Sequence, residues 1–140
     1  MTIFVDDFRA QARVGRISAR WSHLTCGPFD DPAELHEFAD RIGLRRSWYQ
    51  GPPGHPWPRC HYDVTETKRA EAIKAGAVPI SWRELGRRLS LARQARKRAQ
   101  RPICTLTTDG KPLTGQDRYL LAAAFYELAL ATSARPPEVA

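Results

Sequence analysis

The chain has 140 residues, of which 42% are hydrophobic, and a net charge of +7. This is enough apolar side chain for the core of one small domain and excludes wholesale disorder. The apolar stretch 119–131 contains Glu127 and is too short to cross ~30 Å of hydrocarbon, so we expect no membrane span. Met1 is not followed by a charged and then apolar leader, and the three cysteines are too widely spaced for a disulfide framework, which predicts a cytoplasmic protein.

Residues 1–80 are predicted to form an α/β body, with α+β as the alternative, in which helices flank a small sheet. Asp31, Pro32 and Glu34 are a helix-start signal, and an apolar stripe then leads to Gly43 as the stop. A second helix is predicted over 65–75. The expected strands are 2–6, 16–25, 44–50, 61–64 and 77–80. Residues 51–58 contain four prolines (GPPGHPWP) and are predicted to be a rigid loop.

Residues 81–140 are predicted to be a helical C-terminal part that packs on the body. Ser81 and Glu84 form a capping box for a helix that ends near Gln100. After a connector at 102–113, Thr114 is the predicted cap of a last helix over 115–133. The apolar side chains of this last helix lie on nearly its whole circumference. A monomer would expose too many of them, so we expect a homodimer through this helix.

The positive charge is concentrated in residues 81–111, which carry 9 basic and 2 acidic side chains, a balance of +7. Such a segment is typical of a solvated surface or of a footprint for the phosphates of a nucleic acid. A helix that binds a peptide groove or a membrane surface is a further alternative. No base-reading motif accompanies it, so sequence specificity is not expected. The basic residues that share one helical face are Arg83, Arg87, Arg93, Lys97, Arg98 and Arg101.

The most informative segment is CHYDVTETKR at 60–69. In an extended conformation, His61 and Asp63 point to one face of the sheet and Tyr62 to the other. Lys68 and Arg69 follow at the start of a helix, where cations oppose the helix dipole and a bound phosphate would compensate them. The alternatives are that both cations are solvated and that Asp63 is simply the N-cap of the helix. We predict Tyr62, Lys68 and Arg69 as ligand-binding residues.

His23 lies on a separate predicted strand, and it meets His61 if the two strands are neighbours. Two imidazoles with Asp63 or Asp6 could move protons or bind a metal, whereas a structural role is the ordinary alternative. The chain has no HExxH or CxxC spacing, so we predict His23, His61 and Asp63 as catalytic residues and no metal site, with the cofactor unspecified. A looser zinc set would combine these histidines with Cys26 and Cys60.

Several of these segments together resemble domain-of-unknown-function family number 4031, small proteins of bacteria and their phages. The resemblance covers about residues 2–80, and the family has no established activity, so it implies kinship and names no ligand. The chain departs from the family in TCGPFDD at 25–31 and in its long loop at 51–60. The resemblance therefore does not imply the shape of any pocket rim. The matching segments are IFVDD at 3–7, His23 of SHL, ELHEFADRIGL at 34–44, WYQ at 48–50, HYDVTETKR at 61–69 and AGA at 75–77.

Three functions are therefore predicted, in decreasing order of support. The first is binding of a phosphate-bearing partner, a nucleic acid or a nucleotide, through His61, Lys68, Arg69 and the Arg-rich helix. The second is a small enzyme for a nucleotide or phosphorylated substrate, with His23 and His61 as general acid and base and Asp63 as the group that orients one imidazole. The third is a phage- or host-regulatory interaction protein. Whether the chain is an enzyme is left open by the sequence.

Overall fold

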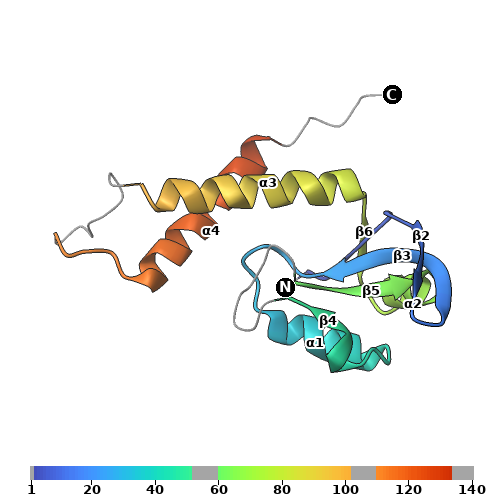
Figure 1. Cartoon of the computed structure of the whole chain (residues 1–140). Coiled ribbons are helices and arrows are strands. Elements are labelled where there is room, and N and C mark those ends of the chain that lie inside the picture. The colour runs from blue at the N-terminus through green and yellow to red at the C-terminus, as the bar shows by residue number, and fades with distance from the viewer. Residues whose placement is uncertain (1, 52–59, 102–109, 134–140) are drawn as a thin grey trace. The chain divides into compact units, whose positions relative to one another are not determined.

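The computed structural model describes residues 2–51, 60–101 and 110–133 (Figure 1). The chain forms two compact units, Met1–Gly86 and Arg87–Ala140, and the division falls inside a helix. A mixed sheet with helices makes up the first unit, and helices make up the second. The predicted α/β class with a helical C-terminal part is confirmed.

The sheet of the first unit has six strands in the order β4-β5-β3-β1-β6, with β2 paired to β3 outside this path. β1 and β6 run parallel, and all other neighbours are antiparallel. The central strands β1, β3 and β5 therefore bring together residues that are far apart in the chain. The strands are β1 (Phe4–Asp6), β2 (Ala10–Val14), β3 (Ile17–Thr25), β4 (Tyr49–Gln50), β5 (His61–Thr65) and β6 (Val78–Ile80).

One face of this sheet packs against the helices α1 (Pro32–Arg41) and α2 (Glu66–Lys74), as Figure 1 shows. Because side chains alternate along a strand, the residues between those on the core face point to the opposite face. The opposite face carries Asp6, His23, His61 and Asp63. The core face and the two helices contribute Val5, Leu24, Tyr62, Val64, Leu35, Phe38, Ala39, Ile42 and Ala72 to one hydrophobic cluster.

The start and stop of α1 follow the sequence signals. The Asp31 side chain accepts a hydrogen bond of 2.9 Å from the Ala33 amide, and Gly43 adopts a φ of 73°, which favours glycine, just after the helix. For α2, the alternative in which Asp63 is the N-cap is wrong. Thr65 is the N-cap and accepts a hydrogen bond from the Lys68 amide, because β5 continues to Thr65 and keeps Asp63 extended.

Two further expectations about the strands need correction. The single strand predicted over 44–50 is a 3-10 turn at Arg46–Trp48 followed by the short β4. The strand β2 was not predicted; it forms a hairpin with β3 through a tight turn in which Gly15 has a φ of 60°. Four of the five β2 residues are exposed, so this strand lacks the alternation of buried and exposed residues by which a strand is recognised.

The helices α3 (Trp82–Ala99) and α4 (Gly115–Thr132) lie almost where they were predicted. Ser81 Oγ accepts a hydrogen bond from the Glu84 amide, and Thr114 and Asp117 form a reciprocal capping box at the start of α4. In the second unit the two helices run antiparallel. Contacts at both ends show this, since Arg87 donates to Ser133 Oγ and Arg118 donates to the Ala99 carbonyl.

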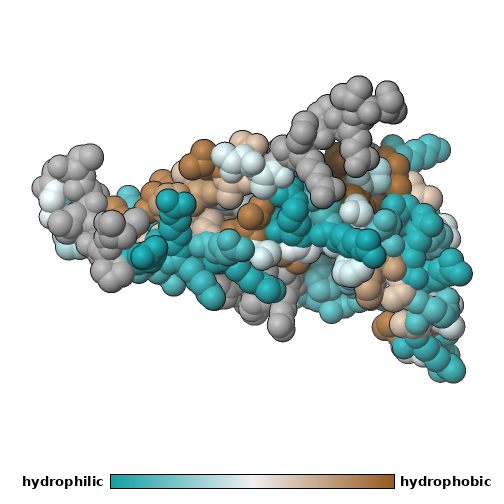
Figure 2. All heavy atoms as spheres, turned by 90° about the horizontal axis from the view of Figure 1, so that it is seen from above, coloured by the Kyte–Doolittle hydropathy of each residue, from teal (hydrophilic) through white to brown (hydrophobic). Residues whose placement is uncertain are grey.

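The surface of the helical part is mixed in character. In Figure 2, hydrophobic and hydrophilic side chains lie side by side over the half that contains α4. Leu120 and Leu128 of α4 are 56% and 59% exposed, whereas Ala122 and Tyr126 on the same helix are buried. None of the helices in the described part of the chain is long and apolar enough to cross a membrane.

Candidate functional site

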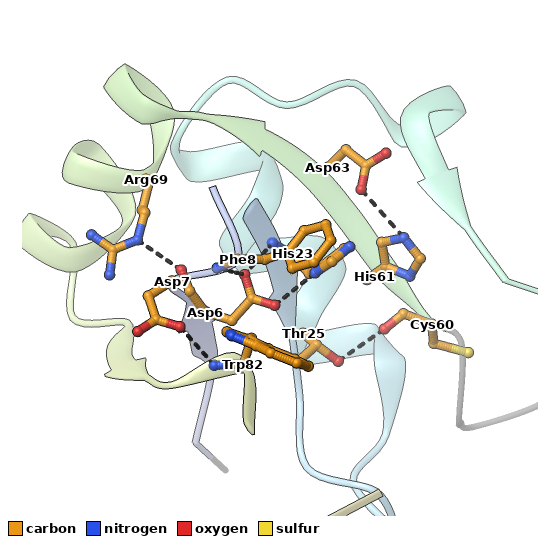
Figure 3. A network of polar contacts seen from close by, with 10 residues as sticks. All are labelled: Asp6, Asp7, Phe8, His23, Thr25, Cys60, His61, Asp63, Arg69 and Trp82. Carbon is orange, nitrogen blue, oxygen red and sulfur yellow. Dashed lines mark hydrogen bonds and ion pairs between the residues drawn. The ribbon is translucent and has the colours of Figure 1, made fainter. Parts of the chain in front are cut away.

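Three predicted catalytic residues come together on the face of the sheet that does not carry the core (Figure 3). His23 on β3 pairs directly with Asp63 on β5, and His61 precedes Asp63 by two residues, so all three share a face. One ligand atom of each side chain lies within 4.8 Å of the others. The two imidazole rings are 5.0 Å apart, edge to face. We call these three residues the His-Asp cluster.

A buried carboxylate contacts one ring nitrogen of His23. Asp6 at the end of β1 is 1% exposed, and its Oδ2 lies 2.6 Å from His23 Nδ1. Its Oδ1 accepts hydrogen bonds from the backbone amides of His23 and Phe8. The hydrogen bond to Asp6 raises the pKa of His23 above its ordinary value, against the opposing effect of burial. With Nδ1 engaged, Nε2 is the ring nitrogen of His23 left to meet a proton, a metal ion or a substrate.

The second half of the cluster is a pair within β5. His61 Nε2 lies 3.3 Å from Asp63 Oδ1, and Gln50 Nε2 on β4 donates a 2.6 Å hydrogen bond to Asp63 Oδ2. The hydrogen bond from His61 is the main reason that the pKa of Asp63 is lowered, so this side chain is a carboxylate at neutral pH. Gln50 was not predicted, because only the pairing of β4 with β5 brings it here.

Solvent reaches the cluster. The side chains of His23, His61 and Asp63 are 34%, 23% and 29% exposed, respectively. The ring of Phe8 stacks on His23 at a centroid distance of 5.3 Å, and the edge of Trp82 approaches Phe8 at 6.2 Å. The cluster is therefore an accessible polar centre next to two aromatic side chains.

The same three residues could hold a metal ion. Two imidazoles and one carboxylate form a donor set that suits a divalent transition metal, and a second carboxylate on the far nitrogen of one imidazole is the usual outer support of such a site. Within residues 2–51, 60–101 and 110–133, this is the one group of three or more side chains with that geometry. Cys26 and Cys60 of the looser zinc set do not belong to it. Cys26 lies in the hydrophobic core, where burial raises the pKa of its thiol to about 12.

Lys68 and Arg69 do not meet at the N-terminus of α2. Lys68 Nζ donates to the Ile42 carbonyl at 2.7 Å and pairs with Glu71 Oε2 at 2.6 Å, at the end of α1. Arg69 Nε donates to the Asp6 carbonyl at 2.7 Å, at the end of β1. Both cations thus donate hydrogen bonds to backbone carbonyls. The positive charge of Lys68 is balanced by a neighbouring carboxylate rather than by a phosphate.

Tyr62 is placed on the core face. It is fully buried, and its hydroxyl lies 2.8 Å from His36 Nδ1, so it cannot touch a ligand at the His-Asp cluster. His36 is only 7% exposed, and the Tyr62 hydroxyl is the polar partner of its imidazole inside the protein. Burial is the main reason that the pKa of His36 is lowered.

The six basic residues predicted for nucleic acid lie on α3 and just after it. Arg83 belongs to the first unit, where its guanidinium lies 5.9 Å from the centre of the Trp82 ring. In the second unit, Arg87 donates to Ser133, and Arg98 lies 4.6 Å over the ring of Phe125. Arg93, Lys97 and Arg101 are exposed.

Comparison with known proteins gives one match. Residues 3–92 fit the model of the family described as "Protein of unknown function (DUF4031)". The match covers the whole sheet and most of α3. No curated protein and no solved structure matches the chain. The chain belongs to this family, as its sequence motifs predicted.

Proposed function

We propose that this member of the DUF4031 family is a small metal-dependent hydrolase that acts on a nucleotide or another phosphorylated substrate. The observation that carries the proposal is the convergence of His23, His61 and Asp63 from two strands, with their ligand atoms within 4.8 Å of one another. In this proposal the three side chains bind one divalent transition-metal ion, such as Zn²⁺ or Mn²⁺.

The support from Asp6 favours a metal over a simple acid–base pair. A histidine that binds a metal usually donates its other ring N–H to a carboxylate, which fixes the tautomer and the orientation of the ring. The Asp6–His23 contact has this form. Three protein ligands leave coordination positions for water and substrate, which is typical of catalytic rather than structural sites.

An ion held by His23, His61 and Asp63 would supply an acidified water molecule and positive charge beside the phosphoryl oxygens. The overall reaction would be the addition of water across the bond between phosphorus and the leaving oxygen. The oxygen of water would go to phosphorus, one of its protons would go to the leaving oxygen, and the other would go to solvent.

The net charge of +7 supports a phosphorylated substrate. The contacts of Lys68 and Arg69 with backbone carbonyls argue against the phosphate site first predicted at α2. In this proposal the phosphate is therefore bound by the metal ion instead.

A second candidate function uses the same residues without a metal. The pKa of His23 is raised, so its protonated form persists closer to neutral pH and could act as a general acid. His61, paired with Asp63, would then be the base. Activity that survives complete removal of divalent ions would favour this candidate.

The experiment is metal binding followed by turnover in the full chain. After treatment with a chelator, the protein is titrated with Zn²⁺, Mn²⁺ and Co²⁺ by calorimetry, and hydrolysis of bis(p-nitrophenyl) phosphate is measured. We expect one ion per chain and metal-dependent hydrolysis. His61→Ala and Asp63→Asn should weaken both, and Asp40→Asn on the exposed side of α1 should change neither. A chain that binds no divalent ion at this cluster would contradict the proposal.

A further inference from the structure

Two large aromatic side chains remain exposed next to the His-Asp cluster. Phe8 is 47% exposed and Trp82 is 50% exposed. Phe8 stacks on His23 with an interplanar angle of 30°, and Trp82 meets Phe8 edge to face at 6.2 Å (Figure 3). The three rings form one continuous aromatic surface that ends at the cluster.

The backbone amides of both aromatic residues are held by Asp6, the last residue of β1, and by Asp7, which follows it. Asp6 Oδ1 accepts a hydrogen bond from the Phe8 amide, and Asp7 Oδ1 accepts one of 2.7 Å from the Trp82 amide. Asp6 is also the residue that orients His23. One short segment therefore fixes the catalytic imidazole and both aromatic residues, which is the preorganisation that a binding surface requires.

The charges around the rings indicate what kind of ligand fits. Arg83 places its guanidinium 5.9 Å from the centre of the Trp82 ring, and Arg9, next to Phe8, pairs with Glu66 at 3.1 Å. An aromatic surface beside cations suits a ligand that has both a flat π-system and a negative charge. A purely apolar peptide or a lipid chain has no negative charge that could pair with these cations.

Resting on the proposed function, we propose that Phe8 and Trp82 form a stacking platform for an unpaired nucleobase, whose phosphate would then reach the His-Asp cluster. The substrate class is thereby narrowed from phosphorylated compounds to those that carry a base. Recognition by stacking tolerates every base, because each has a π-face. The base comes either from a free nucleotide or from an unpaired position in a single strand.

The test uses 2-aminopurine, a fluorescent base, with the full chain in the presence of a chelator so that no cleavage occurs. The two probes are 2-aminopurine riboside monophosphate and a single-stranded oligonucleotide with one 2-aminopurine. An oligonucleotide with an abasic site at that position, added as a non-fluorescent competitor, is the control ligand. We expect saturable quenching of the fluorescence and weaker binding of the abasic strand. Tight binding of the monophosphate identifies a free nucleotide as the source, and binding of the strand alone identifies nucleic acid.

The variants separate stacking from apolar contact. Phe8→Leu and Trp82→Leu keep an apolar side chain but remove the ring, and we expect affinity to fall roughly 5- to 150-fold. Trp82→Phe should keep most of the affinity. Trp48→Leu is the matched control, because Trp48 is 49% exposed and lies in the turn before β4. If the Leu variants bind as tightly as the unchanged chain, or lose affinity equally for the abasic strand, the platform is not a base-binding surface.

Metal binding, turnover and base binding, each measured on the same variants, distinguish this proposal from the proposed function. His61→Ala should lose metal binding and turnover and still quench 2-aminopurine. Trp82→Leu should keep one metal ion per chain and lose affinity for the base. Base binding by a chain that takes up no divalent ion in the calorimetric titration would support the platform and overturn the hydrolase, and uptake of an ion by a chain that binds no base would do the reverse.

Discussion

Asp6 and His23 are 17 residues apart in the chain, yet Asp6 Oδ2 lies 2.6 Å from His23 Nδ1. The contact exists because β1 and β3 are antiparallel neighbours whose register pairs Val5 with Leu24. The carboxylate is buried, and the imidazole is partly exposed. A buried side chain therefore positions a residue of the solvent-accessible His-Asp cluster.

Replacing Asp6 with Asn should separate orientation from charge at this contact. The shape is kept, but the largest cause of the raised His23 pKa is removed, so the pKa should fall in an NMR titration of the metal-free chain. Removal of such an outer partner typically weakens a metal site ~10- to 100-fold. Calorimetric titration with Zn²⁺ measures this weakening. The control is Asp7→Asn, which makes the same chemical change at the neighbouring residue and should leave the affinity for Zn²⁺ unchanged. If Asp6→Asn also binds Zn²⁺ as tightly as the unchanged chain, Asp6 does not support the metal site.

His23 and His36 should give opposite pH dependences of stability. The pKa of His23 is raised in the folded state. Its contribution to the free energy of unfolding is therefore complete below the ordinary pKa of 6.5 and is lost as the pH rises through the pKa of the folded state. The pKa of His36 is lowered, so its contribution is present above 6.5 and is lost as pH falls toward the folded pKa. The free energy of unfolding in urea, measured from pH 5 to 8, distinguishes the two.

Each histidine is tested against its own Gln variant in metal-free protein. The stability difference between the unchanged chain and His23→Gln should shrink as pH rises. The difference for His36→Gln should grow instead. Curves that run in the same direction for both variants would show that one of the two assigned environments is wrong.

Lys68 should behave as a structural residue. Lys68→Met keeps the aliphatic stem but removes the cation that donates to the Ile42 carbonyl at the end of α1. We expect the free energy of unfolding to fall by about 1 kcal/mol, as when a favourable charge is removed from a helix C-terminus. Metal and base binding should be unchanged. Arg20→Met, at an exposed position of β3, is the control for stability. Weaker phosphate-dependent binding in Lys68→Met would restore the ligand role predicted from the sequence.

The basic face of α3 should bind nucleic acid without sequence preference. In the double variant Arg93→Gln, Lys97→Gln, affinity for any single strand should fall. The slope of log K against log salt should decrease by roughly 0.7–0.9 for each phosphate that the variant no longer neutralises. Arg16→Gln with Arg20→Gln removes the same charge from exposed positions of the β2–β3 hairpin and should have a smaller effect. Equal effects of the two pairs would mean that net charge alone attracts the strand.

The homodimer predicted through the last helix can be tested at Leu120 and Leu128, which are more than half exposed. Exposed apolar side chains in a contiguous patch commonly mark an interface. We expect a dimer mass in analytical ultracentrifugation at high micromolar concentration and a monomer for Leu120→Glu with Leu128→Glu. A monomer before any substitution would remove the dimer from consideration.

Local signals in the sequence were sufficient for most helices. Asp31 and Thr114 cap α1 and α4 because a capping side chain acts on amides only two or three residues away. Asp63 shows the limit of such signals, since both Asp63 and Thr65 can start a capping motif. The choice between them was made by the pairing of β5 with β3, which keeps Asp63 extended.

The site could be predicted only in part for the same reason. His61 and Asp63 are neighbours on one strand, so their shared face was readable from alternation alone. The meeting with His23 depended on which strands are adjacent. Gln50, Phe8 and Trp82 reach the cluster through sheet order and through backbone hydrogen bonds to Asp6 and Asp7, and no pattern in the sequence specifies these.

The direct pairing of His23 with Asp63 makes the cluster depend on the alignment of two strands. Sliding β5 by one residue along β3 would turn His61 and Asp63 toward the helices and expose Tyr62 and Val64 on the other side. The hydrophobic core and the His-Asp cluster are thus both set by a single register. Insertion or deletion of one residue within β5 should therefore abolish folding and the proposed activity together, whereas point substitutions on the cluster face should remove the proposed activity alone.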